Sequence, residues 1–501
     1  MRSGMKGRRR TVPAWVVAAV VLTTATTTSA FVATAQGATA QGATAQGATA
    51  QGATAQGATA QGATTQGGQP AQLSGPVQPG DAAELVGGAA GPALRAARYV
   101  QREYFASGTA YSYQATGPEN GAGTWTVAPA TGAPYRTRIV VRTPSNPSRF
   151  NGTVVVEWLN VSGGGDAAVD SVYLSPELER AGFAWVGVSA QPVGIDQLRQ
   201  KDPARYASLV DPGDQFSFDI YTQAARALLR RGPSNPLAPL HPKRLLAVGE
   251  SQSALFLTTY IDAIQPLYRV FDGFLVHSRA GGAIPIPGGA PNGGPFGGAV
   301  RIRTDIGVPV LTMITETDES FGQYYRARQP DDRFIRLWDV AGASHADTYI
   351  VSSAEFRSLG CTSIDEAPSH FVFEAALSAL NHWVQSGTPP PPAPRMDVQD
   401  VNGVPTVQDD GAGSAMGGIQ GPWERVPVAA YSGKSPIGAP SFCVLFGTTR
   451  PFSGAQLRAM YGSRAHYLEA YTRATDEDIK AGYLLAADRA QVLSFAHQVH
   501  F

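Results

Sequence analysis

The sequence predicts an α/β fold with a mostly parallel central sheet and helices on both of its faces. Short apolar runs alternate with helix-like segments through the second half of the chain, and one apolar run leads straight into a helix near residue 250. Apolar strands without polar alternation are typical of sheets covered on both sides. With 501 residues, 43% of them hydrophobic, the chain can bury the core that such a fold needs.

The elements follow one another in the order that this fold requires. Runs of β-branched residues at 136–142 (RTRIVVR) and 153–161 (TVVVEWLNV) predict two strands, and Asn151-Gly152 between them is a hairpin-type turn signal. Residues 219–231 have apolar positions at helical spacing and a basic last turn, which predicts a helix. The other expected strands are residues 183–189, 244–248, 271–276, 308–315 and 334–340, and the other expected helices are residues 253–264 and 371–384.

Two Gly/Pro-rich segments and a helical tail complete the folded part. Residues 279–307 are expected to form a loop over an active site, and residues 388–420 read as coil. Residues 457–501 look helical again. We assign residues 81–501 to one large domain, in which residues 401–501 are an extension that either packs on the main sheet or forms a small unit of its own.

The N-terminal residues 1–35 are typical of a signal peptide. Arg8, Arg9 and Arg10 precede an apolar stretch at 12–22, and an A-x-A site ends at Ala35. The apolar stretch is shorter than the roughly 20 residues of a membrane span, so we expect a secreted or cell-envelope protein without stable membrane insertion after cleavage. A short uncleaved anchor and a twin-arginine export route stay open.

Residues 36–80 are expected to form a disordered linker. Six copies of A-Q-G-A-T fill residues 35–64 without a charged, aromatic or large apolar side chain. Such a segment cannot offset the entropy lost on ordering.

The distribution of charge argues against a nucleic-acid partner. Lys plus Arg and Asp plus Glu both number 39, and five of the basic residues lie in the first ten positions. The remainder is therefore mildly acidic and has no Lys/Arg run. A dinucleotide fingerprint, a phosphate loop and a metal-ligand spacing are also missing from the sequence, so no cofactor is expected. The two cysteines, Cys361 and Cys443, predict a disulfide in an exported protein.

Ser251 is the candidate nucleophile. The sequence LLAVGESQSAL runs from an apolar strand directly into a helix, with Gly249 and Ser253 flanking Ser251 in a G-x-S-x-[small] pattern. A sharp strand-to-helix turn lifts its central residue above the sheet, next to the positive end of the following helix. Ser253 replaces the second glycine of the usual pattern but is also small.

This stretch resembles the nucleophile elbow of the α/β-hydrolase superfamily. The resemblance implies an acid after the strand at 308–315 and a histidine after the strand at 334–340. Asp318 and His345 occupy these places, with Glu316 as the alternative acid. The segments VEWLNVSGG, AWVGVSAQ, GESQSA, FDGFLVHSR and TETD are similar to those of exported bacterial α/β-hydrolase-domain proteins. The resemblance covers the chain from about residue 81 and implies an α/β-hydrolase fold with esterase-like activity.

The same resemblance implies an oxyanion hole and a substrate pocket. Gln252 would supply one backbone amide, and the glycine-rich loop after residues 153–161 would supply a second from Val161 or Ser162, of which we prefer Val161. His277 ends a strand and Ser189 follows one, so both are candidate pocket residues, although each can equally be structural. Ser189 is not the nucleophile by this reasoning, since Gln191-Pro192 after it is not expected to open a helix.

The sequence therefore predicts a secreted serine hydrolase that acts on a small-molecule or polymeric carboxylic ester. Two alternatives stay open: a peptidase or amidase on the same fold, and a non-catalytic binding module that retains this fold.

Overall fold

The computed structural model describes residues 67–78, 85, 91–232, 234–287, 298–436, 439 and 442–501. The predicted signal peptide, the A-Q-G-A-T repeats and the middle of the loop 279–307 lie outside the described residues.

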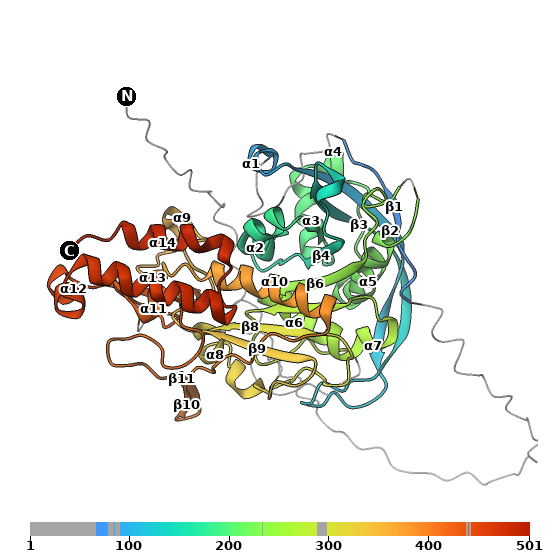
Figure 1. The fold of residues 1–501 in the computed structure, drawn as a ribbon. Helices are drawn as coiled ribbons and strands as arrows, with labels where there is room; N and C mark the ends of the chain where they lie inside the picture. The colour runs from blue at the N-terminus through green and yellow to red at the C-terminus, as the bar shows by residue number, and fades with distance from the viewer. Residues whose placement is uncertain are drawn as a thin grey trace, which may run out of the picture.

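Within the described residues, a nine-stranded sheet forms the centre of the molecule, in the order β1-β2-β3-β5-β4-β6-β7-β8-β9 (Figure 1). The six strands β5, β4, β6, β7, β8 and β9 are parallel to one another. The three strands at the other edge, β1, β2 and β3, pair antiparallel. The predicted fold class, a mostly parallel sheet between helices, is confirmed. The strands are β1 (Gln72–Ser74), β2 (Tyr99–Ala115), β3 (Val127–Pro144), β4 (Thr153–Trp158), β5 (Ala184–Val188), β6 (Arg244–Glu250), β7 (Gly273–His277), β8 (Val310–Thr315) and β9 (Ile335–Val340), with β10 (Val398–Val401), β11 (Val404–Val407), β12 (Ala429–Ser432) and β13 (Thr448–Pro451) in two small hairpins.

Helices lie on both faces of this sheet (Figure 1). Helices α2 and α10 pack against each other and against the middle strands, while α5 and α6 cover the other face. The helices are α1 (Gly91–Ala96), α2 (Val169–Arg180), α3 (Pro192–Lys201), α4 (Pro203–Tyr206), α5 (Ser217–Leu228), α6 (Gln252–Thr259), α7 (Gln265–Tyr268), α8 (Glu316–Ser320), α9 (Ser353–Ser358), α10 (His370–Ser386), α11 (Pro422–Arg425), α12 (Gly454–Tyr461), α13 (Arg464–Ala481) and α14 (Arg489–His497).

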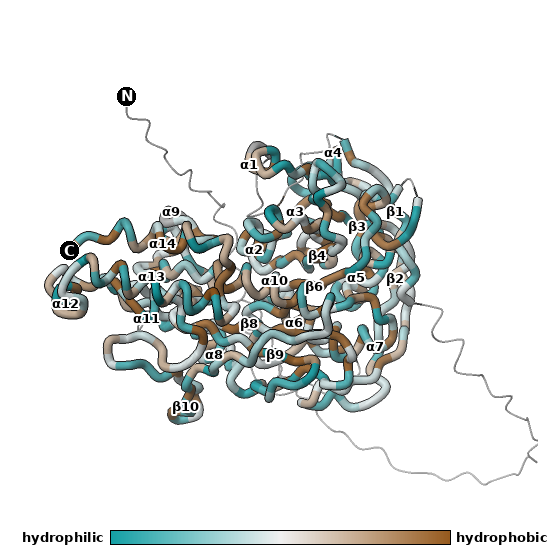
Figure 2. The backbone as a smooth tube through the Cα atoms, in the orientation of Figure 1, coloured by the Kyte–Doolittle hydropathy of each residue, from teal (hydrophilic) through white to brown (hydrophobic). Residues whose placement is uncertain are grey.

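The apolar strands divide their side chains between two cores. In β6, Leu246 and Val248 belong to the core under α2 and α10, whereas Leu245 and Ala247 belong to the core under α5 and α6. Because successive strand residues point to opposite faces, a strand buried on both sides is mostly apolar along its whole length. The hydropathy colouring of Figure 2 accordingly places hydrophobic residues along central strands such as β4 and β6.

The hairpin predicted at Asn151-Gly152 is wrong. The two strands that flank this turn, β3 and β4, do not pair with each other, because β5 lies between them. The chain does bend at Gly152, which adopts a positive φ of 95°. A local turn signal fixes the change of direction but not the strand that the next segment joins.

The predicted linker of residues 36–80 extends too far toward the C-terminus. Strand β1 pairs with β2, and the Gly68 amide donates to Asp219 Oδ1 at 2.7 Å. The Ala71 amide donates to the carbonyl of Gln223. The folded part of the chain therefore includes residues before 81.

The C-terminal residues pack on the main core. Tyr467, Tyr471 and Val492 are buried in the same hydrophobic cluster as Leu246 of the central strand β6. The helices α12, α13 and α14 lie together beside the sheet, at the end marked by β8 and β9 (Figure 1).

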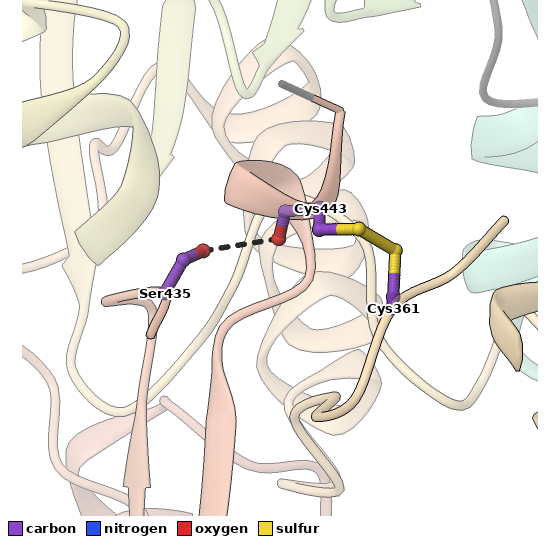
Figure 3. Close-up of a disulfide and its surroundings, with 3 residues drawn as sticks. All are labelled: Cys361, Ser435 and Cys443. Carbon is purple, nitrogen blue, oxygen red and sulfur yellow. Dashed lines mark hydrogen bonds between the residues drawn. A yellow bond between two sulfur atoms is a disulfide. The ribbon is translucent and has the colours of Figure 1, made fainter. Parts of the chain in front are cut away.

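Cys361 and Cys443 form the predicted disulfide (Figure 3). The bond joins segments 82 positions apart, and the Ser435 hydroxyl donates to the Cys443 carbonyl at 3.0 Å beside it. It therefore ties the C-terminal segment to the loop that follows β9.

Candidate active site

The elbow at Ser251 has the backbone conformation that its sequence predicts. Ser251 lies between the end of β6 and the start of α6, with φ 57° and ψ −117°. A positive φ is strained for a serine, and its amide is fixed by donation to the His277 carbonyl at 3.0 Å. A Cβ on Gly249 would come within 3.2 Å of the Ser253 backbone, so a larger residue there would crowd the turn.

Ser253, which replaces the second glycine of the usual pattern, is part of the turn. Its side chain is completely buried, and its hydroxyl donates to the Glu250 carbonyl at 2.8 Å. The Glu250 amide donates back to the same hydroxyl at 3.2 Å. A glycine at position 253 would only allow close packing, whereas Ser253 also joins the two ends of the elbow by hydrogen bonds.

Ser251, His345 and Asp318 lie in one hydrogen-bonded line. Ser251 Oγ is 2.8 Å from His345 Nε2, and His345 Nδ1 is 2.6 Å from Asp318 Oδ1. Only 8% of Ser251 is exposed, so the line is largely shielded from water. This geometry allows the imidazole to take a proton from the serine while the carboxylate fixes the ring orientation.

Asp318 is held by the turn from which it projects. It is the third residue of α8, and its Oδ2 accepts hydrogen bonds from the amide and the hydroxyl of Thr315, both at 2.8 Å. Burial opposes ionisation of Asp318, but the charge of His345 and these hydrogen bonds hold its pKa below the usual value. Asp318 is therefore ionised and oriented toward His345.

Glu316 points to different partners. Its Oε2 accepts from the Ser432 hydroxyl at 2.7 Å and from the Gly433 amide. Burial raises the pKa of Glu316 in spite of these bonds. The structure thus brings Asp318, and not Glu316, to the histidine.

His345 lies in a loop fixed by the C-terminal segment. The Ala346 amide donates to the Leu445 carbonyl at 3.0 Å, and the Ser344 amide donates to Asp365 Oδ2 at 2.9 Å. Burial alone would lower the pKa of His345. The charges of Asp318 and Glu250, together with the hydrogen bond to Asp318, raise the pKa to about 9.

Backbone amides are available where the oxyanion hole is expected. As the first residue of α6, Gln252 has an N–H without an acceptor in its own helix. In the loop after β4, the Ser162 amide already donates to Asn160 Oδ1 at 2.8 Å. Among the described residues the Val161 amide has no such intramolecular acceptor, which favours Val161 over Ser162.

Asn160 and Glu250 complete the site and were missed at the level of sequence. Asn160 Nδ2 donates at 3.0 Å both to the Glu250 carbonyl and to Glu250 Oε2, so it joins the glycine-rich loop to the elbow. Glu250 Oε1 lies 3.3 Å from His345 Nε2. The only signal in the sequence was an acidic residue directly before the candidate nucleophile, and this signal does not show which side chains the acid contacts.

The two candidate pocket residues are buried. Ser189 has no exposed surface; its hydroxyl is 2.5 Å from Asp166 Oδ2 and accepts from Arg138 Nε at 3.1 Å. Ser189 thus serves a buried polar network and does not line an open pocket. His277 is 2% exposed, and its Nδ1 lies 2.9 Å from Asp170 Oδ1.

The environment of Ser189 also corrects a detail of the sequence reasoning. Gln191-Pro192 does open a helix, α3, because proline suits the first helical position. Ser189 differs from Ser251 in that two residues, Ala190 and Gln191, separate it from the following helix. Its hydrogen bonds also involve no histidine.

The comparison with known families agrees with this architecture. Residues 73–494 match the model of an alpha/beta hydrolase domain family. The chain belongs to this family. No curated protein matches the chain.

Solved structures of α/β hydrolases are similar to parts of the chain. A serine hydrolase without lid from Xanthomonas campestris is 15% identical, with a TM-score of 0.26 over 41% of this chain and 78% of the other. An esterase from Rhizomucor miehei is 11% identical, with a TM-score of 0.30 over 59% of this chain and 89% of the other. Dienelactone hydrolase from Anabaena variabilis is 13% identical, with a TM-score of 0.27 over 45% of this chain and 87% of the other. Likenesses this distant carry no information about the substrate.

Among the described residues, no helix combines the length and the apolar character that crossing a membrane requires. In the same part of the chain, no group of three or more His, Cys, Asp or Glu side chains is arranged to hold a metal ion.

Proposed function

We propose that the protein is an exported serine hydrolase that cleaves carboxylic esters through an acyl-enzyme on Ser251. The observation that carries this proposal is the line from Ser251 Oγ through His345 to Asp318, with distances of 2.8 and 2.6 Å. A buried line of this kind, at a strained elbow, is the arrangement that activates a serine hydroxyl.

The reaction follows from the position of each group. His345 Nε2 takes the hydroxyl proton while Ser251 Oγ attacks the ester carbonyl carbon. The amides of Gln252 and Val161 stabilise the oxyanion of the tetrahedral intermediate. The imidazolium then protonates the leaving alcohol, and a water molecule, deprotonated by the same imidazole, releases the acid and restores Ser251.

A fluorophosphonate probe tests whether Ser251 is the nucleophile. We expect the wild type to be labelled and the Ser251→Ala variant not to be labelled. Ser494→Ala, which removes an exposed hydroxyl that donates to the Gln491 carbonyl in α14, is the control and should still be labelled. A wild type that is not labelled, or equal labelling of wild type and Ser251→Ala, contradicts the proposal and leaves a non-catalytic module.

The leaving group distinguishes an esterase from a peptidase or amidase. The sequence has no propeller-like repeat of the kind that gates peptide substrates, which favours esters. A series of p-nitrophenyl esters of rising acyl length, compared with p-nitroanilides of the same acyl groups, measures this preference. Higher kcat/KM values for the anilides would overturn the ester assignment.

Export is part of the same proposal and is supported by the N-terminal pattern and by the disulfide. Fractionation of a bacterial host, followed by N-terminal sequencing of the exported protein, should give a chain that begins after Ala35. Retention of the full chain in the cytoplasm would contradict it.

A further inference from the structure

His345 is approached by two carboxylates. Asp318 binds its Nδ1 at 2.6 Å, and Glu250 Oε1 lies 3.3 Å from its Nε2, the nitrogen that also faces Ser251 Oγ at 2.8 Å. The family pattern needs only the first of these carboxylates. The second contact is therefore a feature that the proposed reaction leaves unexplained.

Glu250 is held in place from two directions. Its other oxygen, Oε2, accepts a hydrogen bond from Asn160 Nδ2 at 3.0 Å, and its backbone is closed by the two hydrogen bonds with Ser253. Only 5% of Glu250 is exposed. The carboxylate therefore has little freedom to turn away from His345 toward water.

Two pairs of charged groups act on Glu250. Besides His345 with Asp318, these groups are His277 and Asp170, which lie 2.9 Å apart. Burial raises the pKa of Glu250 to about 7, although the positive charges of the two histidines act against this rise and the two aspartates add to it. The charge of Glu250 also contributes to the raised pKa of the buried Tyr173 hydroxyl.

We propose that Glu250 is a positioning residue that stabilises the imidazolium of His345 from the Nε2 side and so sets the pH range in which Ser251 is activated. This proposal rests on the function proposed above. When Ser251 transfers its proton, the new Nε2–H lies between Ser251 Oγ and Glu250 Oε1, and the ionised carboxylate stabilises it until the proton passes to the leaving alcohol. No further co-reactant is needed, because the proton that leaves serine is the proton that the alcohol receives.

The same charge has an opposing effect on the resting enzyme. An anion beside Nε2 favours the protonated imidazole, which cannot accept the serine proton. The charge of Glu250 therefore speeds the transfer of the Ser251 proton to His345. It also moves the pH range in which the enzyme works toward alkaline pH. Removal of the charge should reverse both effects.

The Glu250→Gln variant tests this directly, because the amide keeps the size of the side chain and an acceptor for Asn160. We expect the pH midpoint of Ser251 labelling by the fluorophosphonate, and that of kcat/KM on p-nitrophenyl esters, to fall by about 1 pH unit or more. The plateau value of kcat should also fall, with KM nearly unchanged. Glu250→Asp retains the charge and should keep its midpoint nearer to that of the wild type.

Asp262→Asn is the matched control. Asp262 is a completely buried carboxylate that follows α6, and it accepts from the Arg303 amide at 3.0 Å. It does not contribute to the pKa of His345. This variant should therefore leave the midpoint unchanged, and a shift equal to that of Glu250→Gln would show a general effect of buried charge and overturn the proposal.

The remaining outcomes separate the two proposals. Labelling of the wild type at Ser251 with the same midpoint in Glu250→Gln overturns the role of Glu250 and leaves the serine hydrolase intact. Absence of labelling in the wild type overturns both. Should Glu250→Gln fail to fold, Glu250→Met removes the same charge at similar volume, and an unchanged midpoint in that variant is equally decisive against the role of Glu250.

Discussion

The disulfide fixes the loop that carries His345. The loss in the free energy of unfolding on its removal can be calculated from the length of chain that it closes. Cys361 lies four residues before Asp365, whose carboxylate binds the Ser344 amide. Cys443 lies two residues before Leu445, whose carbonyl binds the Ala346 amide. The two segments that the disulfide joins therefore both contact the loop of His345, and the bond spans 82 positions.

Replacement of both cysteines by alanine frees the unfolded chain of this cross-link. Loop-closure entropy for about 82 residues corresponds to a loss of about 4.5 kcal/mol in the free energy of unfolding. For a folded unit of roughly 420 residues, with an unfolding entropy of about 0.9 kcal/mol/K, this loss lowers Tm by about 5 °C.

Differential scanning calorimetry of wild type and of the double variant Cys361→Ala/Cys443→Ala measures this change. The control repeats the comparison in a reductant, where the unfolded wild type also loses its cross-link and the difference should shrink to about 1 kcal/mol for the two lost sulfur atoms. Equal Tm values without reductant would refute the reasoning. A gap that persists undiminished in reductant would place the effect in native packing instead.

Three further predictions concern the site itself. Asp318→Asn should lower kcat by about 10⁴-fold, because the amide no longer fixes the working tautomer of His345, whereas Glu316→Gln should keep most of its turnover and lose thermal stability; steady-state kinetics and calorimetry compare them. Asn160→Ala should lower kcat by roughly tenfold to a hundredfold with little change in KM, because the glycine-rich loop loses its tie to the elbow; a purely KM effect would contradict this. The rate of fluorophosphonate labelling should rise with pH through about 9, since His345 accepts a proton only when neutral and its pKa is raised to that value; a midpoint below 7 would contradict this.

The strands of the main sheet were predictable because their burial on both faces leaves a direct trace in the sequence. Each residue of β4 and of β8 is buried; β8 appears as an unbroken apolar or β-branched run, and Glu157 alone interrupts that of β4. Strand β2 was not predicted, because its 17 residues mix buried positions with exposed Arg and Gln at the antiparallel edge of the sheet. The pairing of β3 with β5 could not be predicted either, since strand order depends on contacts far along the chain.

The elbow was predictable for a different reason. Its conformation is local, so a strand, a small residue, a serine and a helix in sequence are sufficient to indicate it. The contacts of Glu250 are not local, since Asn160 lies 90 positions away and His345 is reached only when β6 and β9 stand in one sheet. Sequence reasoning could therefore place the serine but not the second carboxylate beside its histidine.

The choice between the two acids shows why the C-terminal extension belongs to the scaffold of the site. Glu316 is satisfied by Ser432 and Gly433, and the Thr317 hydroxyl donates to the Gly433 carbonyl at 2.8 Å. A Cβ at Gly433 would come within 2.5 Å of the Glu316 side chain, so the extension approaches the acid loop as closely as a glycine allows. With Glu316 held on that side, Asp318, two residues later and about 200° around the same turn of α8, faces His345. Residues more than 110 positions later in the chain therefore hold Glu316 away from His345, which is why the sequence around residue 316 left both carboxylates open.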